Sequence, residues 1–200
     1  MKPHTGRLLI FLGLMTTAAA SQAITFTAQL TGPNESPPVA SPGTGFAIVD
    51  FDQAAHTLRV NETFSGLLST TTASHIHCCV ATPGTGTAAV ATQVPTFAGF
   101  PLGVTSGAYD NTFNTLLAST WNPAFVTASG GTVAGAEAVL AAGLLAGTSY
   151  INIHTSQFPT GEIRGFLTQA ASGQAPEPGS IALLAIAFGA LVTTRRRSVL

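Results

Sequence analysis

Apolar and polar residues alternate along much of the chain between residues 24 and 168, as they do in β-strands that bury one face. Segments rich in glycine, proline and serine separate these runs and predict turns and loops. About seven or eight short strands at this spacing predict an all-β domain, a Greek-key β-sandwich with an Ig-like or superoxide-dismutase-like outline. The clearest predicted strands are residues 24–30, 46–52, 58–64 and 73–81, and the two arms of a hairpin within residues 150–167.

One segment departs from this period of two. Between residues 132 and 145 the apolar residues approximate the spacing of a helix, and alanine favours helix formation. The sequence therefore predicts one short helix, with Thr132 as its N-cap and Gly147 ending it. Residues 87–103 and 108–115 have mixed patterns that assign no element, and residues 121–125 predict a loop with two aromatic rings at the edge of the core.

The hairpin within residues 150–167 is the most regular segment. Its arms flank a turn-forming Phe-Pro-Thr-Gly at residues 158–161. Strand alternation places Ile151, Ile153 and Ile163 on the core face. The opposite face then gathers four polar side chains, Asn152, His154, Glu162 and Arg164.

A second polar strand contains the sequence SHIHCC at residues 74–79, where His75 and His77 share one face. If this strand neighbours the hairpin, His154 joins them, and three imidazoles then converge on one ion. Imidazole ligands in an exported, oxidising setting suit copper, with zinc as the alternative. The other interpretation is that the three histidines are structural and hydrogen-bond to strand edges or to Glu162.

Three further residues are secondary candidates for this site. By strand alternation Cys79 shares the face of the two histidines and is a candidate fourth ligand; the alternatives are a disulfide to the adjacent Cys78 or an inert thiol. Glu162 is a candidate carboxylate ligand. Arg164 is a candidate for attracting a small anion such as superoxide, and the alternative is an ion pair with Glu162 that closes the hairpin. His56 lies in a predicted turn and is interpreted as a solvated residue.

The two ends of the chain differ from the domain between them. Residues 1–23 combine basic residues, an apolar run and small residues before Ala23, which predicts a secretory signal peptide and export. Residues 171–180 form a linker with a Pro-Glu-Pro motif, and residues 181–200 hold an apolar run followed by three arginines. This run is shorter than the ~20 residues that cross a bilayer, and the arginines favour a cytoplasmic C-terminus.

Charge and motifs exclude several functions. Residues 24–175 contain two arginines, no lysine and seven acidic residues, a net charge of −5. Nucleic-acid binding is not expected, because it depends on basic contacts to phosphates. No nucleophile elbow, phosphate-binding loop or dinucleotide fingerprint is present to support a hydrolase or nucleotide-binding enzyme. Both methionines, Met1 and Met15, lie in the predicted signal peptide, which excludes a methionine-ligated copper site.

Several motifs resemble a known family. The SHIHCC strand with its Pro-Gly loop, the segment AGTSYINIHTSQFPTGEIRGFL and the opening TAQLTGPNESPPVASPGTGFAIVDFD resemble the CHRD domain, which is named from chordin and occurs in many exported bacterial proteins. The resemblance implies a single CHRD-type domain over residues 24–170. CHRD units in animals are associated with protein binding.

The C-terminal segment resembles the PEP-CTERM sorting signal of bacteria that export proteins along with extracellular polysaccharide. This resemblance implies transient anchoring in the inner membrane and cleavage near the motif by an exosortase-type transpeptidase. The protein would then reach the cell envelope, the cell surface or the extracellular matrix. The alternative is a plain C-terminal anchor with the same orientation.

The sequence is compatible with two functions. One is a protein with a copper-type site which, if it is an enzyme, is a superoxide-dismutase-like oxidoreductase. The other is a non-enzymatic extracellular-matrix or adhesion module that binds matrix or polysaccharide, in which the histidines only stabilise the sheet.

Overall fold

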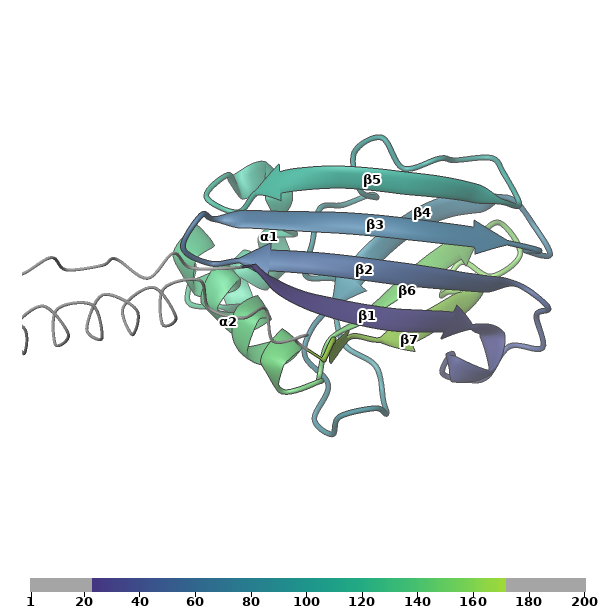
Figure 1. Ribbon diagram of the computed structural model, residues 1–200, viewed down its shortest axis with the longest axis horizontal. Coiled ribbons are helices and arrows are strands. Elements are labelled where there is room, and N and C mark those ends of the chain that lie inside the picture. The colour runs from purple at the N-terminus through teal and green to yellow at the C-terminus, as the bar shows by residue number, and fades with distance from the viewer. Residues whose placement is uncertain (1–22, 172–200) are drawn as a thin grey trace, which may run out of the picture.

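The structure is a computed structural model, and it describes residues 23–171 (Figure 1). The predicted signal peptide and the C-terminal sorting segment lie outside the described residues, apart from Ala23 and Ala171 at their borders. Among the described residues, no helix has both the length and the apolar character that crossing a bilayer requires. The elements are β1 (Ile24–Thr31), η1 (Gly32–Asn34), β2 (Thr44–Asp52), β3 (Thr57–Ser65), β4 (Thr71–His77), β5 (Gly107–Asn114), η2 (Ala118–Thr120), α1 (Pro123–Ala128), α2 (Val133–Leu145), β6 (Tyr150–Thr155), β7 (Ile163–Phe166) and β8 (Thr168–Gln169).

The strands form one antiparallel sheet in the order β4-β6-β7-β1-β2-β3-β5, with β8 paired to β1. The sheet curls so that β4, β6 and β7 lie behind β1, β2, β3 and β5 (Figure 1). The two parts meet where Thr31 of β1 pairs with Arg164 of β7. The predicted all-β, sandwich-like fold is therefore confirmed, with its two layers formed by a single curled sheet.

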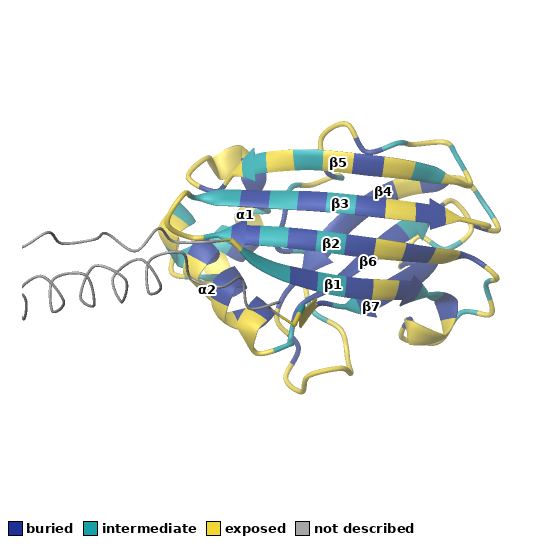
Figure 2. Cartoon of the chain, in the orientation of Figure 1, coloured by how far each residue is buried: buried dark blue, intermediate teal, exposed yellow. Residues whose placement is uncertain are grey.

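The apolar core lies between the two layers. On β1, β2 and β3 burial largely alternates along each strand, as Figure 2 shows, because one face meets the core and the other meets solvent. Strands β4 and β6 are instead buried at most positions on both faces. Their core face contributes Ile76, Ile151 and Ile153, while loops cover their opposite face. Helix α2 adds Leu140 and Leu144 to the core.

The helices follow local sequence signals. The Thr132 side chain accepts a hydrogen bond from the Gly135 amide at 3.0 Å, so the predicted N-cap of α2 is confirmed. Gly147, with φ of 66°, follows the helix end as predicted. The predicted loop at residues 121–125 is wrong in part, because Asn122 caps a six-residue helix, α1, that begins at Pro123. Such a short helix lacks the periodicity by which helices are recognised.

Two other strand predictions change. Strand β4 ends at His77 rather than at residue 81, because the amide of Cys78 turns to the Ala89 carbonyl and that of Val80 to the Thr148 carbonyl. Residues 108–115, for which the sequence predicts no element, lie mostly in edge strand β5, which pairs along its length with β3. The buried rings of Trp121 and Phe125 stack at the edge of the core, as predicted.

Arg164 ties two loops to the sheet. Its guanidinium donates to the Asn34 carbonyl and, at 3.0 Å, to the Gly86 carbonyl. It pairs with Glu35, whose carboxyl lies 3.7 Å away and whose pKa is raised by burial to about 7, against the lowering effect of Arg164. The guanidinium also lies over the ring of Tyr150, 4.8 Å from its centroid. Because both members of this ion pair are buried, the loops and the strands stabilise each other through it.

Glu62 occupies a core position on β3. Its carboxyl is fully buried and is contacted by the Ser74 hydroxyl of the opposite layer, at 2.9 and 3.0 Å. Burial raises the pKa of Glu62 from 4.5 to about 8, although the bond from Ser74 acts in the other direction. The single hydroxyl hydrogen of Ser74 can serve one acceptor. When Glu62 is protonated, its O–H donates to Ser74, and Ser74 donates to the Asn152 carbonyl at 3.0 Å.

The stabilising contribution of Glu62 should fall as the pH rises from about 5 to about 8. In this range folded Glu62 keeps a proton that the unfolded chain has lost, so this residue stabilises the fold less as the pH rises. The contribution is on the order of 4 kcal/mol. In Glu62→Gln, which keeps a donor for Ser74, this part of the pH dependence should disappear. Urea unfolding of both proteins from pH 5 to 9 measures it, and parallel curves would show that Glu62 is ionised in the folded state.

Replacing Arg164 by lysine should destabilise the fold by about 2 kcal/mol, because one ammonium group cannot reproduce the planar contacts to two loops and an aromatic ring. The matched control is Arg59→Lys. Arg59 pairs with Asp50 and Asp110 on the exposed face of the sheet, where a lysine can still pair. Urea midpoints measured side by side test this, and equal midpoints for the two variants would contradict the anchoring role of Arg164.

Candidate metal centre

The register of β4 on β6 brings three histidines together. Residue 75 pairs with Asn152, residue 77 with Tyr150, and residue 73 with His154. Paired residues of antiparallel strands point to the same face, so His75, His77 and His154 share the face turned away from the apolar core. One ring nitrogen from each histidine lies within 4.8 Å of the others. The structure thus supplies the neighbouring strands on which the sequence-based hypothesis depended, whereas metal binding itself stays a prediction.

Each imidazole is oriented by a backbone carbonyl. A carbonyl oxygen only accepts, so the ring nitrogen facing it must carry the proton. The three bonds are His75 Nε2 to Pro95 at 2.7 Å, His77 Nδ1 to Ala88 at 2.9 Å, and His154 Nδ1 to Pro159 at 2.9 Å. In the neutral rings, the lone pairs therefore lie on His75 Nδ1, His77 Nε2 and His154 Nε2.

These lone pairs have no suitable partner among the described residues. His75 Nδ1 lies 3.2 Å from His154 Nε2, but two unprotonated nitrogens cannot share a hydrogen bond. His77 Nε2 is buried and contacts no donor. An imidazole whose N–H is held by a carbonyl while its other nitrogen is free has the arrangement of a metal-bound histidine.

Burial keeps these rings neutral. It lowers the pKa of His75 to about 4, and the charges of His154 and His77 add to the effect. It lowers the pKa of His77 to about 4 as well, against the opposing bond to Ala88. The pKa of His154 is also lowered, again mainly by burial. At neutral pH all three rings are therefore neutral, each with one unprotonated nitrogen, which is the form that binds a metal ion.

The loop at residues 88–95 covers the cluster and was missed by sequence reasoning. It supplies two of the three orienting carbonyls, and Val90 forms a bridge with His77. The Tyr150 ring stacks on the His77 ring with centroids 4.6 Å apart, and its hydroxyl contacts the Ala88 carbonyl at 3.2 Å. The mixed polarity of this loop gave no signal, because its contribution comes from backbone atoms.

Glu162 lies outside the cluster. The possible ligand group among the described residues contains the three histidines but not this carboxylate. Its oxygens instead accept hydrogen bonds from the Ser41 hydroxyl at 2.7 Å, the Leu68 amide at 2.6 Å and the Thr155 hydroxyl at 2.7 Å. These donors fix the turn end of the hairpin to two loops, so the arrangement gives Glu162 a structural role rather than a ligand role.

The structure joins Cys78 and Cys79 in a disulfide, the alternative to ligation by Cys79. A disulfide sulfur offers no thiolate to a metal, so Cys79 is not a ligand in this state. Gly143 of α2 makes room for the pair, since a Cβ at that position would collide with both sulfurs. The two cysteines therefore belong to the contact between helix and sheet rather than to the histidine cluster.

Arg164 pairs with Glu35 and not with Glu162 as one interpretation proposed. Both residues line a hollow of about 500 Å³ that also includes Phe166 and the loop at residues 84–86. Because Glu35 offsets its charge, Arg164 provides less attraction for an anion than a free guanidinium would.

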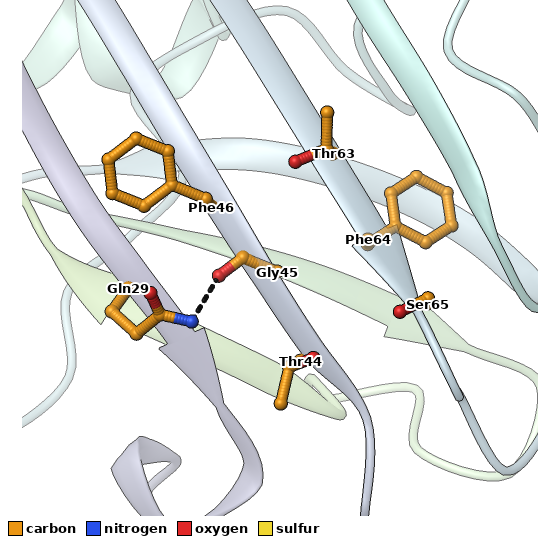
Figure 3. A pocket seen from close by; sticks show the side chains of 7 residues that line it. All are labelled: Gln29, Thr44, Gly45, Phe46, Thr63, Phe64 and Ser65. Atoms are coloured by element: carbon orange, nitrogen blue, oxygen red, sulfur yellow. Dashed lines mark hydrogen bonds between the residues drawn. The ribbon is translucent and has the colours of Figure 1, made fainter.

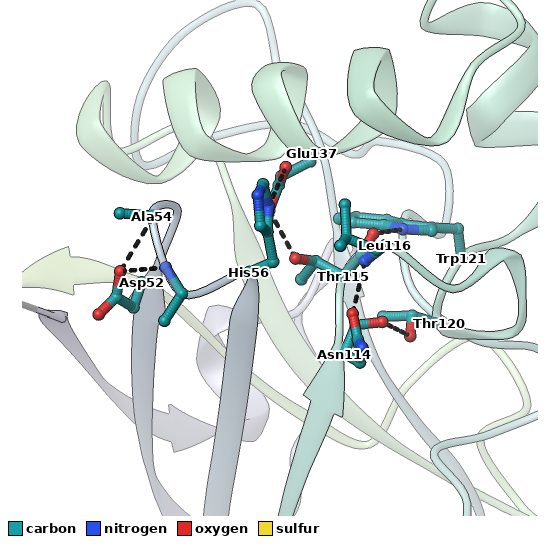
Figure 4. Close-up of polar contacts among 10 residues, drawn as sticks. Asp52, Ala54, His56, Asn114, Thr115, Leu116, Thr120, Trp121 and Glu137 are labelled. Atoms are coloured by element: carbon teal, nitrogen blue, oxygen red, sulfur yellow. Dashed lines mark hydrogen bonds and ion pairs between the residues drawn. The ribbon is translucent and has the colours of Figure 1, made fainter.

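Two other features lie away from the histidine cluster, a surface depression on the sheet and an ion pair at helix α2. A depression of about 400 Å³ on the outer face of β1, β2 and β3 surrounds Phe46 and includes none of the histidines (Figure 3). His56, interpreted as solvated, is half-exposed and pairs with the buried Glu137 of α2 at 3.0 Å (Figure 4). Glu137 also accepts from the Thr115 hydroxyl at 2.5 Å. His56 therefore holds the helix to the β2-β3 turn.

Comparison with known proteins places the domain in a family. Searches of curated proteins and of solved structures give no match. The family model described as the CHRD domain matches residues 26–167, which include most of β1 and both histidine strands, and domains of this type are typically extracellular. Since the match spans more than half of the chain, the protein belongs to the CHRD domain family.

Proposed function

We propose that this protein is an exported CHRD-domain protein of the bacterial envelope or extracellular matrix that binds one transition-metal ion through His75, His77 and His154. One observation supports this most strongly. The cluster contains three neutral imidazoles, and one nitrogen of each donates to a backbone carbonyl. Their other, unprotonated nitrogens lie close together on a largely buried face of the sheet. Structural histidines satisfy their polar atoms within the protein, whereas these rings leave theirs free.

Copper is the proposed ion and zinc the alternative. Imidazole nitrogen binds both, and copper is the tighter of the two in the usual order of affinities. Bound copper would supply one-electron redox chemistry, and superoxide is a substrate of that class, so superoxide dismutation is the activity to assay first. Within this proposal the chain's own residues orient the imidazoles and exclude bulk water.

A second candidate function is a non-enzymatic matrix or adhesion module that contacts matrix proteins or polysaccharide. The observation that favours it is the same set of carbonyl bonds, because the histidines also pin the loop at residues 88–95 and the turn at Pro159 to the sheet. In that case the rings act as cross-links, and no ion is needed.

The ends of the chain support the proposed route of export. Residues 1–23 would direct secretion, and residues 181–200 would hold the protein transiently in the inner membrane until an exosortase-type transpeptidase cleaves near the Pro-Glu-Pro motif. This part of the proposal rests on sequence alone.

The exported protein should bind about one copper or zinc ion per chain and lose it in His75→Ala/His154→Ala. At a free metal concentration ~1,000 times Kd, binding should stabilise the fold by about 4 kcal/mol, because the unfolded chain does not assemble the site. Metal analysis and thermal unfolding with and without metal measure both effects.

The matched control is His56→Ala, which removes a histidine that pairs with Glu137 away from the cluster and should leave metal content unchanged. A wild-type protein that stays free of metal even after loading, together with a double variant that melts at a lower temperature, would reject the metal site and favour the structural module.

A further inference from the structure

Asn152 lies within the same strand patch as the three histidines. It pairs directly with His75 across the ladder, lies diagonal to His77, and is two residues from His154 on β6. The four side chains therefore share one face and form a staggered patch of two residues on each strand, in which only His75 and Asn152 are directly paired. Asn152 is 1% exposed, so its amide must find partners inside the protein.

The amide of Asn152 has a fixed orientation. Its nitrogen Nδ2 lies 3.4 Å from the Thr160 carbonyl, to which it donates. This nitrogen and Glu35 Oε1 both lie against Gly161, since a Cβ placed there would strike both atoms. The nitrogen end is thus bonded to the Thr160 carbonyl, with the Glu35 carboxyl on the same side. The oxygen Oδ1 is the other end of the same planar amide, so it is turned away from the Thr160 carbonyl.

This orientation leaves two acceptors without a donor. Four buried side-chain polar atoms in residues 23–171 have no hydrogen-bond partner, and two of them are Asn152 Oδ1 and His77 Nε2. Both have their opposite ends committed, the amide nitrogen to Thr160 and the ring Nδ1 to Ala88. Flipping the amide would place Oδ1 against the Thr160 carbonyl, and moving the ring proton of His77 to Nε2 would leave Nδ1 unprotonated against the Ala88 carbonyl, so each change opposes two acceptors. A cation between them satisfies both at once.

We propose that Asn152 Oδ1 is the fourth protein ligand of the metal ion, which completes a site of three imidazoles and one carboxamide. The inference rests on the proposed function, because it assigns a further donor to the same ion. It explains why an amide and not an apolar residue occupies a fully buried position opposite His75. It also gives Glu35 and Gly161 a role, since the carboxylate and the glycine next to it hold the amide with its oxygen toward the ion.

An uncharged set of four ligands has a chemical consequence. No ligand neutralises the ion, so the two positive charges of a divalent metal remain on the site. The Glu35 carboxyl lies on the side of the amide nitrogen of Asn152 and not on the side of Oδ1. A carboxylate at position 152 would add one negative charge directly to the set of ligands, which gives a sensitive test.

The test is a competition titration of the full exported chain with Zn²⁺ against a chelator of known affinity. Asn152→Asp should bind Zn²⁺ at least tenfold more tightly, because a charged oxygen replaces a neutral one. Asn152→Leu should bind 10- to 100-fold more weakly, which is the range for losing a coordinating or supporting group. The control is Asn111→Leu, which removes a partly exposed amide of β5 and should stay within twofold of the wild type.

A second readout separates ligation from general structural damage. In the Co²⁺-loaded protein, Asn152→Asp should shift the visible absorption bands, while Asn111→Leu should leave them in place. Suppose that His75→Ala no longer binds Zn²⁺, while both Asn152 variants bind it within twofold of the wild type. This result would reject Asn152 as a ligand and leave the histidine site standing. Failure of the wild type to bind Zn²⁺, Cu²⁺ or Co²⁺ would overturn the proposed function and this ligand together.

Discussion

The register of β4 against β6 is the constraint on which the rest of the structure depends. On the core face of these strands Ile76, Ile151 and Ile153 are completely buried, and a slip by one residue would turn them out of the core. The hydrophobic effect on one face therefore decides where the polar side chains of the other face lie. The histidine cluster owes its geometry to isoleucines that never touch it.

A polar strand face buried under loops must have its hydrogen bonds satisfied by those loops. Three backbone carbonyls form hydrogen bonds to the histidine rings. Arg164 and Glu35 form an ion pair that holds neighbouring loops against the same strands. Burying polar groups on this face costs free energy of folding. The same burial favours neutral imidazoles, which are the form that binds a cation. Stability and the proposed chemistry thus come from the same loops.

Much of this arrangement could be predicted from the sequence, because strand alternation is a local property. The period of two placed His75 and His77 on one face and His154 on the polar face of the hairpin, and the helical spacing located α2. Long-range partners had no such signal. Glu35 is far from Arg164 in sequence, and the disulfide at Cys78 and the carbonyl of Pro95 depend on how loops return to the sheet. In the sequence, Asn152 is only one of several polar residues on the hairpin. An amide can be proposed as a metal ligand only once the residues around it are known.

The loop over the histidines also bears on how quickly an ion could enter or leave. His75 and His77 are 6% and 8% exposed, so little of either ring meets solvent in the closed structure. On the side of these two rings, exchange would require the loop at residues 88–95 to lift, which breaks the carbonyl bonds that hold both rings. Loading would then be slow in the folded protein, and an ion acquired while the strands assemble would be retained long after free metal has disappeared from the surroundings.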